Sequence, residues 1–242
     1  MAIRLVVLAV CLLVVACVAP PTVDPPASLP DEFPPSEYEA AKVRGESVYE
    51  IDATRSLIRV FAYRAGSLSR MGHDHVIASR AIRGFILHTP IVDKQGAIVQ
   101  ADLYMPLFSM TVDEESLRAD AGFKTEVSER ARAGTRSNML ASLDAAAYPH
   151  VMLHIDAALD NRELVDAEVP LQVTVTLHGI TSTIEVFAVV SVDADNLQAE
   201  GLFSLCQSDF GVEPHSALGG ALAVRDELVI AFQINATREP VS

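Results

Sequence analysis

Residues 171–178 read Leu171-Gln172-Val173-Thr174-Val175-Thr176-Leu177-His178, a strict alternation of apolar and polar side chains. Successive side chains of a β-strand point to opposite faces of the sheet, so this stretch predicts a half-buried strand. Gly179 follows directly and provides the conformational freedom that a turn requires. The stretch therefore predicts one strand of an antiparallel sheet, ending at a tight turn.

Seven more segments have the composition of strands. They are short and rich in Val, Ile, Thr and Phe, and they comprise Ser56–Tyr63, Ile82–His88, Ile98–Leu107, Val151–Ala157, Thr183–Val192, Leu197–Cys206 and Leu228–Asn235. Eight antiparallel strands of this length favour a closed barrel, because closure removes exposed edges. The expected fold class is therefore all-β, an eight-stranded antiparallel barrel. A β-sandwich is the alternative, because strand number alone does not distinguish the two.

One region departs from this pattern. Residues 113–134 are crowded with charged side chains and lack strand alternation, whereas Met139, Leu140 and Leu143 mark a more apolar face. This predicts a short helical excursion, one or two helices between Asp113 and Ser142, that crosses between the strands before and after it.

The overall composition narrows the function. The chain has 242 residues, with 18 Lys and Arg against 32 Asp and Glu, and a formal charge of −14. This acidic balance argues against nucleic acid as a partner, because proteins that bind phosphate backbones carry basic patches. Half of the residues are hydrophobic, which excludes a disordered chain.

The N-terminus has the features of an export signal. Arg4 precedes an apolar run from Leu5 to Ala16, which is too short to span a membrane, and Cys17 follows. Residues 14–17 resemble the lipobox of bacterial lipoproteins, so residues 1–16 are expected to be a signal peptide of the lipoprotein type, with Cys17 as the lipid anchor. An ordinary signal cleaved after Ala19 is the alternative.

The expected domain organisation follows from this signal. Residues 17–46 are rich in proline and predict a disordered tether, and residues 47–238 form the folded barrel domain. The expected location is the cell envelope, on the periplasmic face and anchored to the outer membrane, or otherwise secreted into the periplasm. Oligomeric state is left open.

The predicted strands suggest what the barrel interior holds. They project mostly small and medium apolar side chains, and only 6% of the chain is aromatic, with no Trp. Such side chains fill a barrel axis poorly, so an apolar cavity for an apolar ligand is expected. The expected lining residues are Val173, Val175, Val186, Ala188, Val190, Ile230 and Phe232. A core filled by aliphatic side chains, in a purely structural barrel, is the alternative.

Histidines give a second hypothesis. His73 and His75 are two positions apart, a spacing that puts both imidazoles on one face of a strand, as a shared Zn²⁺ or Cu²⁺ ion would require. His178 and His215 are candidates to complete such a metal site in a periplasmic metal-binding module. The alternative is that His73 and His75 make structural hydrogen bonds.

Catalytic motifs are missing from the sequence. There is no G-x-S-x-G, H-E-x-x-H or C-x-x-C, and Gly219-Gly220 lacks the lysine of a phosphate-binding loop. We therefore expect no catalytic residues and a protein that is not an enzyme.

Several short segments resemble the YceI-like family. They occur in the family's order along the folded domain and comprise Tyr49–Ser56, Gly72–His75, Arg136–Leu140, Leu143–Pro149, Thr176–Thr181, Ser208–Val212 and Leu222–Leu228. The resemblance implies an extended, lipocalin-like eight-stranded barrel with a helical excursion. It also implies a cell-envelope protein that binds or carries a long apolar lipid, such as a polyisoprenoid or a quinone tail, inside the barrel. The paired histidines depart from the family pattern.

Overall fold

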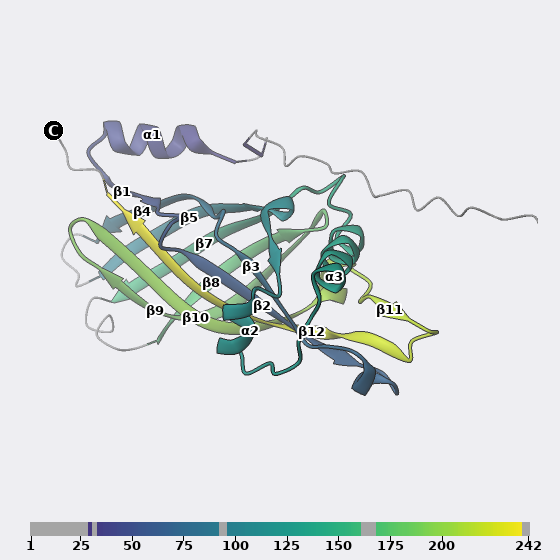
Figure 1. The fold of residues 1–242 in the computed structure, drawn as a ribbon. Helices are drawn as coiled ribbons and strands as arrows, with labels where there is room; N and C mark the ends of the chain where they lie inside the picture. Colours follow the sequence, from purple (N-terminus) through teal and green to yellow (C-terminus); the bar gives the residue numbers. More distant parts are fainter. Residues whose placement is uncertain (1–28, 31–32, 92–95, 161–167, 239–242) are drawn as a thin grey trace, which may run out of the picture.

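The computed structural model describes residues 29–30, 33–91, 96–160 and 168–238. Within these residues the chain forms three α-helices, twelve strands and three short 3₁₀ turns (Figure 1). The helices are α1 (Pro35–Val43), α2 (Glu115–Asp120) and α3 (Glu129–Ser142), and the 3₁₀ turns are η1 (Ser69–Met71), η2 (Leu107–Ser109) and η3 (Gln207–Phe210). The strands are β1 (Ser47–Ile51), β2 (Leu57–Ala65), β3 (His75–Ser79), β4 (Arg83–Pro90), β5 (Gly96–Pro106), β6 (Thr111–Val112), β7 (His150–Asp160), β8 (Glu168–Leu177), β9 (Ile180–Val192), β10 (Asn196–Cys206), β11 (Ser216–Ala217) and β12 (Leu222–Thr237).

Eight of the described strands close into an antiparallel barrel. Neighbours pair in the order β1-β4-β5-β7-β8-β9-β10-β12, and β1 also pairs with β12, which closes the circuit. The closing contact is short, with Glu50 opposite Thr237 and Ile51 opposite Ala236. The predicted all-β barrel is thereby confirmed, and the sandwich alternative is wrong.

The remaining strands extend the barrel at one end. Beyond its contact with β1, the long strand β12 pairs with β2, and β3 and β6 continue the sheet from there. The register between β12 and β2 shifts between Val224 and Leu228, as at a β-bulge, which lets β12 bend. The extension therefore covers the part of the barrel wall that the short β1 does not reach.

The turn between β8 and β9 shows how the sequence sets the register. His178 and Gly179 both have positive φ, 53° and 73°, as in a two-residue turn of type I′. A β-carbon on Gly179 would lie 2.4 Å from the ring of Tyr148, so only glycine fits there. This turn places Leu177 opposite Ile180 and fixes the inward face of both strands.

Helices occupy two places around the barrel. The helices α2 and α3 lie between β5 and β7, as predicted. Ser128 caps the N-terminus of α3, because its hydroxyl accepts a hydrogen bond from Ala131 N. The helix α1 lies on the outer face of β1 and β4, where Tyr38 and Ala41 pack with Val48 (Figure 1). In the part of the chain that the structure describes, no helix is long and apolar enough to cross a membrane.

The helix α1 corrects the predicted tether. The ring of Phe33 lies 4.9 Å from that of Tyr104, and the Tyr38 hydroxyl donates to Asp102 Oδ2 at 2.6 Å. Aromatic burial outweighs the cost of ordering this proline-flanked segment. The prediction of a disordered tether is therefore wrong for residues 33–46, whereas residues 1–28, including Cys17, lie outside the described residues.

Candidate functional site

A cavity of about 330 Å³ lies inside the barrel. Strand alternation builds it, because odd-numbered residues of β8 such as Val173 and Val175 face inward while Gln172 faces solvent. The cavity is within the range of about 300–1,000 Å³ that small-molecule sites occupy. A core completely filled by side chains is therefore not what the structure shows.

The wall of the cavity is almost entirely hydrocarbon. Of the 38 described residues that line it, 32 are apolar, and six carry polar side chains: His75, Thr135, Asn138, Ser142, Gln207 and His215. Phe203 and Phe232 are the aromatic hydrocarbon side chains in this lining, with ring centroids 6.2 Å apart. Aliphatic side chains elsewhere leave the axis open, as the low aromatic content predicts.

The predicted lining residues are nearly all in place. Six of the seven line the cavity, namely Val173, Val175, Val186, Val190, Ile230 and Phe232. Ala188 is completely buried but does not line it, because its methyl group is covered by the surrounding core. The same wall also includes residues of β2 and β5 that were not predicted to line it, such as Val60 and Val99.

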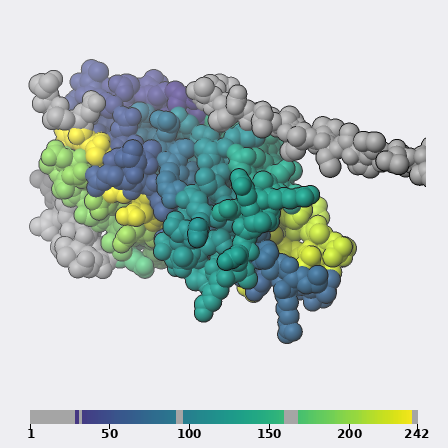
Figure 2. Space-filling view, viewed as in Figure 1, coloured from purple at the N-terminus to yellow at the C-terminus, as the bar shows by residue number. Residues whose placement is uncertain are grey.

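The helix α3 lies across one end of the barrel, beside the hairpin of β11 and β12 (Figure 1). Its residues Thr135, Asn138, Met139 and Ser142 line the cavity together with Leu143, which directly follows the helix, and their spacing puts them on one helical face. In the space-filling view the helical segment covers this region next to the projecting tips of η1 and β11 (Figure 2). The sequence predicted a more apolar face that includes Met139 and Leu143, but it did not predict that this face lines the cavity.

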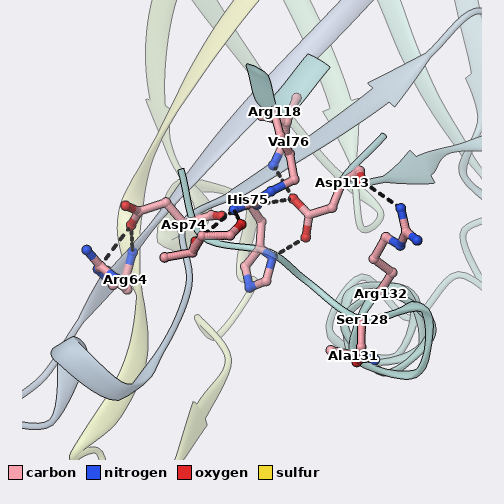
Figure 3. A network of polar contacts seen from close by, with 10 residues as sticks. Arg64, Asp74, His75, Val76, Asp113, Arg118, Ser128, Ala131 and Arg132 are labelled. Atoms are coloured by element: carbon pink, nitrogen blue, oxygen red, sulfur yellow. Dashed lines mark hydrogen bonds and ion pairs between the residues drawn. The ribbon is translucent and has the colours of Figure 1, made fainter. Parts of the chain in front are cut away.

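A network of polar contacts around Asp113 and His75 lies near this end of the barrel (Figure 3). Asp113 is completely buried, and its carboxylate accepts hydrogen bonds from Val76 N at 3.0 Å and Arg118 at 2.7 Å through Oδ1. Its Oδ2 lies 2.6 Å from His75 Nδ1. His75 and Ile77 face the cavity, whereas Val76 and Ala78 pack on the other side of β3 with Leu117 of α2.

The charge of Asp113 is balanced within this network. Burial raises the pKa of this carboxyl group, but the hydrogen bonds from His75, Val76 N and Arg118 lower it by more, so the pKa lies below its ordinary value. Arg118 also donates to Thr125 O at 2.8 Å and to Asp74 O at 2.6 Å. Asp113 is therefore a buried carboxylate that is ionised at neutral pH and orients His75.

The four predicted metal ligands are not brought together. His73 and His75 have ring centroids 6.4 Å apart, but His75 Nδ1 faces Asp113. His178 Nδ1 lies 3.2 Å from Phe210 O in the β8–β9 turn, and His215 Nε2 lies 3.3 Å from Asn138 Nδ2. Among the described residues no three His, Cys, Asp or Glu side chains are arranged to hold a metal ion. The proposed four-histidine site is therefore corrected: His75, His178 and His215 each make a separate local contact instead.

Known proteins share this fold. No family model matches the sequence, and no curated protein matches it. The structure is similar to that of a polyisoprenoid binding domain from Saccharophagus degradans implicated in plant cell wall breakdown, with 13% identity and a TM-score of 0.52 over 80% of this chain and 100% of that one. It is also similar to Burkholderia cenocepacia BcnA, with 15% identity and a TM-score of 0.51 over 77% and 99% of the two chains. A Campylobacter jejuni YCEI protein matches 58% of this chain and 73% of its own at 13% identity, with a TM-score of 0.36 that is too low to add to the argument.

The barrel and its cavity define a class: closed lipocalin-like barrels with an internal apolar chamber. Within that class the chain has the YceI-like fold, which is the fold that the resemblance of the sequence motifs implies.

Proposed function

We propose that this protein binds a long apolar lipid, such as a polyisoprenoid chain or the tail of a quinone-like molecule, inside the barrel. The observation that carries the proposal is the cavity of about 330 Å³ with 32 apolar residues in its wall. Burying hydrocarbon there is worth about 25 cal/mol per Å² and requires no directional partner. An apolar molecule therefore matches the chemistry of this space.

The size of the cavity limits how much of the lipid is enclosed. Its volume lies near the lower end of the range for small-molecule sites. A single chain of modest length fills it, and a longer chain leaves part of its length outside the barrel. The binding step is transfer of hydrocarbon from a membrane or from water into the cavity, with no bond made or broken. The proposed function is accordingly non-enzymatic.

The structural similarity supports this proposal. The Saccharophagus degradans domain is described as polyisoprenoid binding, and it aligns with this chain over its whole length. The same barrel with an apolar interior makes a polyisoprenoid the first ligand to test here. We further propose that the protein is exported and acylated at Cys17, and that it binds the lipid at the periplasmic face of the cell envelope; the predicted N-terminal signal supports this proposal.

Extraction of the purified protein with organic solvent, followed by mass spectrometry, tests the ligand. We expect a reproducible isoprenoid in stoichiometric amount from the wild type. The variant Val173→Phe should yield less than about a tenth of it, because the added ring occupies the cavity. The matched control Gln172→Phe adds the same ring to the outer face of β8 and should retain the lipid.

If the wild-type protein is purified in the presence of its own membranes and its organic extract still contains no lipid, lipid binding is contradicted. Equal lipid in Val173→Phe and the wild type would show that the lipid is not inside the barrel. Cellular fractionation tests the location separately. Cys17→Ser should move the protein from the membrane to the soluble envelope fraction, and an unchanged distribution would exclude acylation as the anchor.

A further inference from the structure

The polar residues of the cavity wall are gathered at one end. His75 begins β3, Gln207 follows β10, His215 precedes β11, and Thr135, Asn138 and Ser142 belong to α3. Each lies at the barrel end that α3 crosses, whereas the rest of the described lining is apolar. A purely hydrocarbon ligand gains nothing from this asymmetry, but a lipid with a polar head would be bound in one orientation.

The side chain of His75 has a defined hydrogen-bonding direction. Asp113 is an ionised carboxylate, so it has only acceptors, and His75 Nδ1 must donate the proton of their 2.6 Å hydrogen bond. In the neutral imidazole the other nitrogen, Nε2, is then an acceptor. Among the described residues Nε2 has no hydrogen-bond partner, and His75 lines the cavity.

The surroundings of His75 keep this arrangement fixed. The Asp113 side chain is completely buried and is held by Arg118, whose side chain is 6% exposed. The main chains of Asp113 and Val76 are also joined by a hydrogen bond of 2.7 Å. Figure 3 shows the imidazole turned so that only one nitrogen meets Asp113. With a neutral imidazole, the protein thus presents an oriented acceptor to the cavity before any ligand binds.

We propose that His75 Nε2 accepts a hydrogen bond from the hydroxyl group of the bound lipid, so that the ligand is a prenyl-chain alcohol, phenol or quinol whose head lies at the α3 end. This inference rests on the proposed function and adds the chemistry of the head group. Asn138 and His215, whose nitrogen atoms are 3.3 Å apart, form the polar rim next to the head. His75 is a binding residue in this proposal, and Asp113 is a positioning residue.

Competition binding with two probes, of which only one carries a hydrogen-bond donor, tests the proposal. Geranylgeraniol carries a hydroxyl donor, and its methyl ether has the same chain but no donor. Each is titrated at pH 8 against the wild type loaded with N-phenyl-1-naphthylamine, a fluorescent apolar probe. We expect the alcohol to bind about two- to tenfold more tightly than the ether, the range of one hydrogen bond.

The variant His75→Phe should bind both probes with equal affinity, because it keeps a ring of similar size but has no acceptor. The control His154→Phe removes a histidine from the outer face of β7, where it pairs with Asp102, and should keep the preference for the alcohol. A purely structural role for His75 would lower both affinities and leave their ratio unchanged.

Three outcomes separate the two proposals. Equal affinities in the wild type, or tighter binding of the ether, overturn the head-group proposal without any need for a variant. A preference that survives in His75→Phe also overturns it. Failure of the wild type to bind either probe would instead contradict the lipid-binding function itself.

Discussion

Asp113 combines two features that each lower the stability of a folded protein when nothing compensates for them. Its backbone has a positive φ of 54°, and its carboxylate is completely buried. Asp and Asn tolerate the left-handed region better than most residues. The buried charge is tolerated because Arg118, His75 and Val76 N all donate to it.

Replacing Asp113 by Asn should lower the free energy of unfolding by about 3–5 kcal/mol at pH 7, because the buried guanidinium of Arg118 loses its counter-charge. Asn keeps the shape of the side chain and its tolerance of positive φ. Urea unfolding followed by circular dichroism measures the loss. Asp144→Asn is the matched control, since Asp144 also has a positive φ but is exposed, and it should change stability by less than about 0.5 kcal/mol. Similar values for the two variants would mean that the Asp113–Arg118 pair contributes little.

The lowered pKa of Asp113 also gives the effect of this variant a pH dependence. A carboxyl group whose folded pKa lies below its unfolded value of about 3.9 stabilises the protein above that value, and the contribution is lost as pH falls through the folded pKa. The stability difference between wild type and Asp113→Asn should therefore be constant from pH 7 to about pH 5 and shrink below about pH 4. Unfolding curves collected across this range measure it. A difference that stays constant down to pH 3 would contradict the assignment.

The sequence identified His75 as a residue of interest but not its partner. The His73 and His75 pair indicated a possible site, and His75 does line the cavity. Its actual partner, Asp113, is 38 positions away and lies within a segment whose many charges looked alike in the sequence. Local spacing can suggest which side chains share a face, but only the pairing of β3 with β6 brings these two together.

The strands were easier to predict than the closure of the barrel. The eight predicted strands correspond to β2, β4, β5, β7, β8, β9, β10 and β12. The prediction omitted β1, β3, β6 and β11, which are five residues long or shorter. The strand β1 closes the barrel by pairing with β12 almost 190 positions later, a contact that no local pattern encodes. Similarly, the proline content of residues 17–46 concealed Phe33 and Tyr38, the aromatic residues that anchor the segment around α1.

The helix α3 covers the cavity without a completely buried residue of its own. Arg136 holds it in place by donating to Met110 O at 3.1 Å and to Phe108 O. Hydrogen bonds of a charged donor are worth about 1.5–3 kcal/mol each. This attachment to the segment between β5 and β6 is therefore a large part of what keeps α3 over the cavity.

Replacing Arg136 by Ala should release α3 while leaving the barrel folded. We expect amide hydrogen exchange within α3 to accelerate by at least about tenfold, and bound lipid to exchange faster, because the cavity opens more often. Mass spectrometry of deuterium uptake measures the first effect, and transfer of a fluorescent lipid to vesicles measures the second. Arg130→Ala, an exposed residue of the same helix, is the control and should change neither rate. Faster exchange in α3 without faster lipid transfer would show that lipid enters elsewhere.

At the scale of the whole molecule, the cavity makes stability depend on the ligand. Its lining comes from all the long strands of the barrel and from α3, so the empty barrel lacks contacts along its whole axis. A ligand that binds only the folded state stabilises it by about 2.7 kcal/mol at a concentration one hundred times its dissociation constant. For a domain of this size each kcal/mol raises the unfolding temperature by about 2–4 °C.

Extraction of the lipid should therefore lower the unfolding temperature of the wild type by about 5–10 °C, and reloading with an isoprenoid should restore it. Differential scanning calorimetry of the extracted and reloaded protein measures both changes. Val173→Phe should show a much smaller response, because its ring already occupies part of the cavity, whereas Gln172→Phe should respond like the wild type. An unfolding temperature that is the same with and without lipid in the wild type would mean that the bound lipid makes no stabilising contact with the barrel, and the cavity would then not be its binding site.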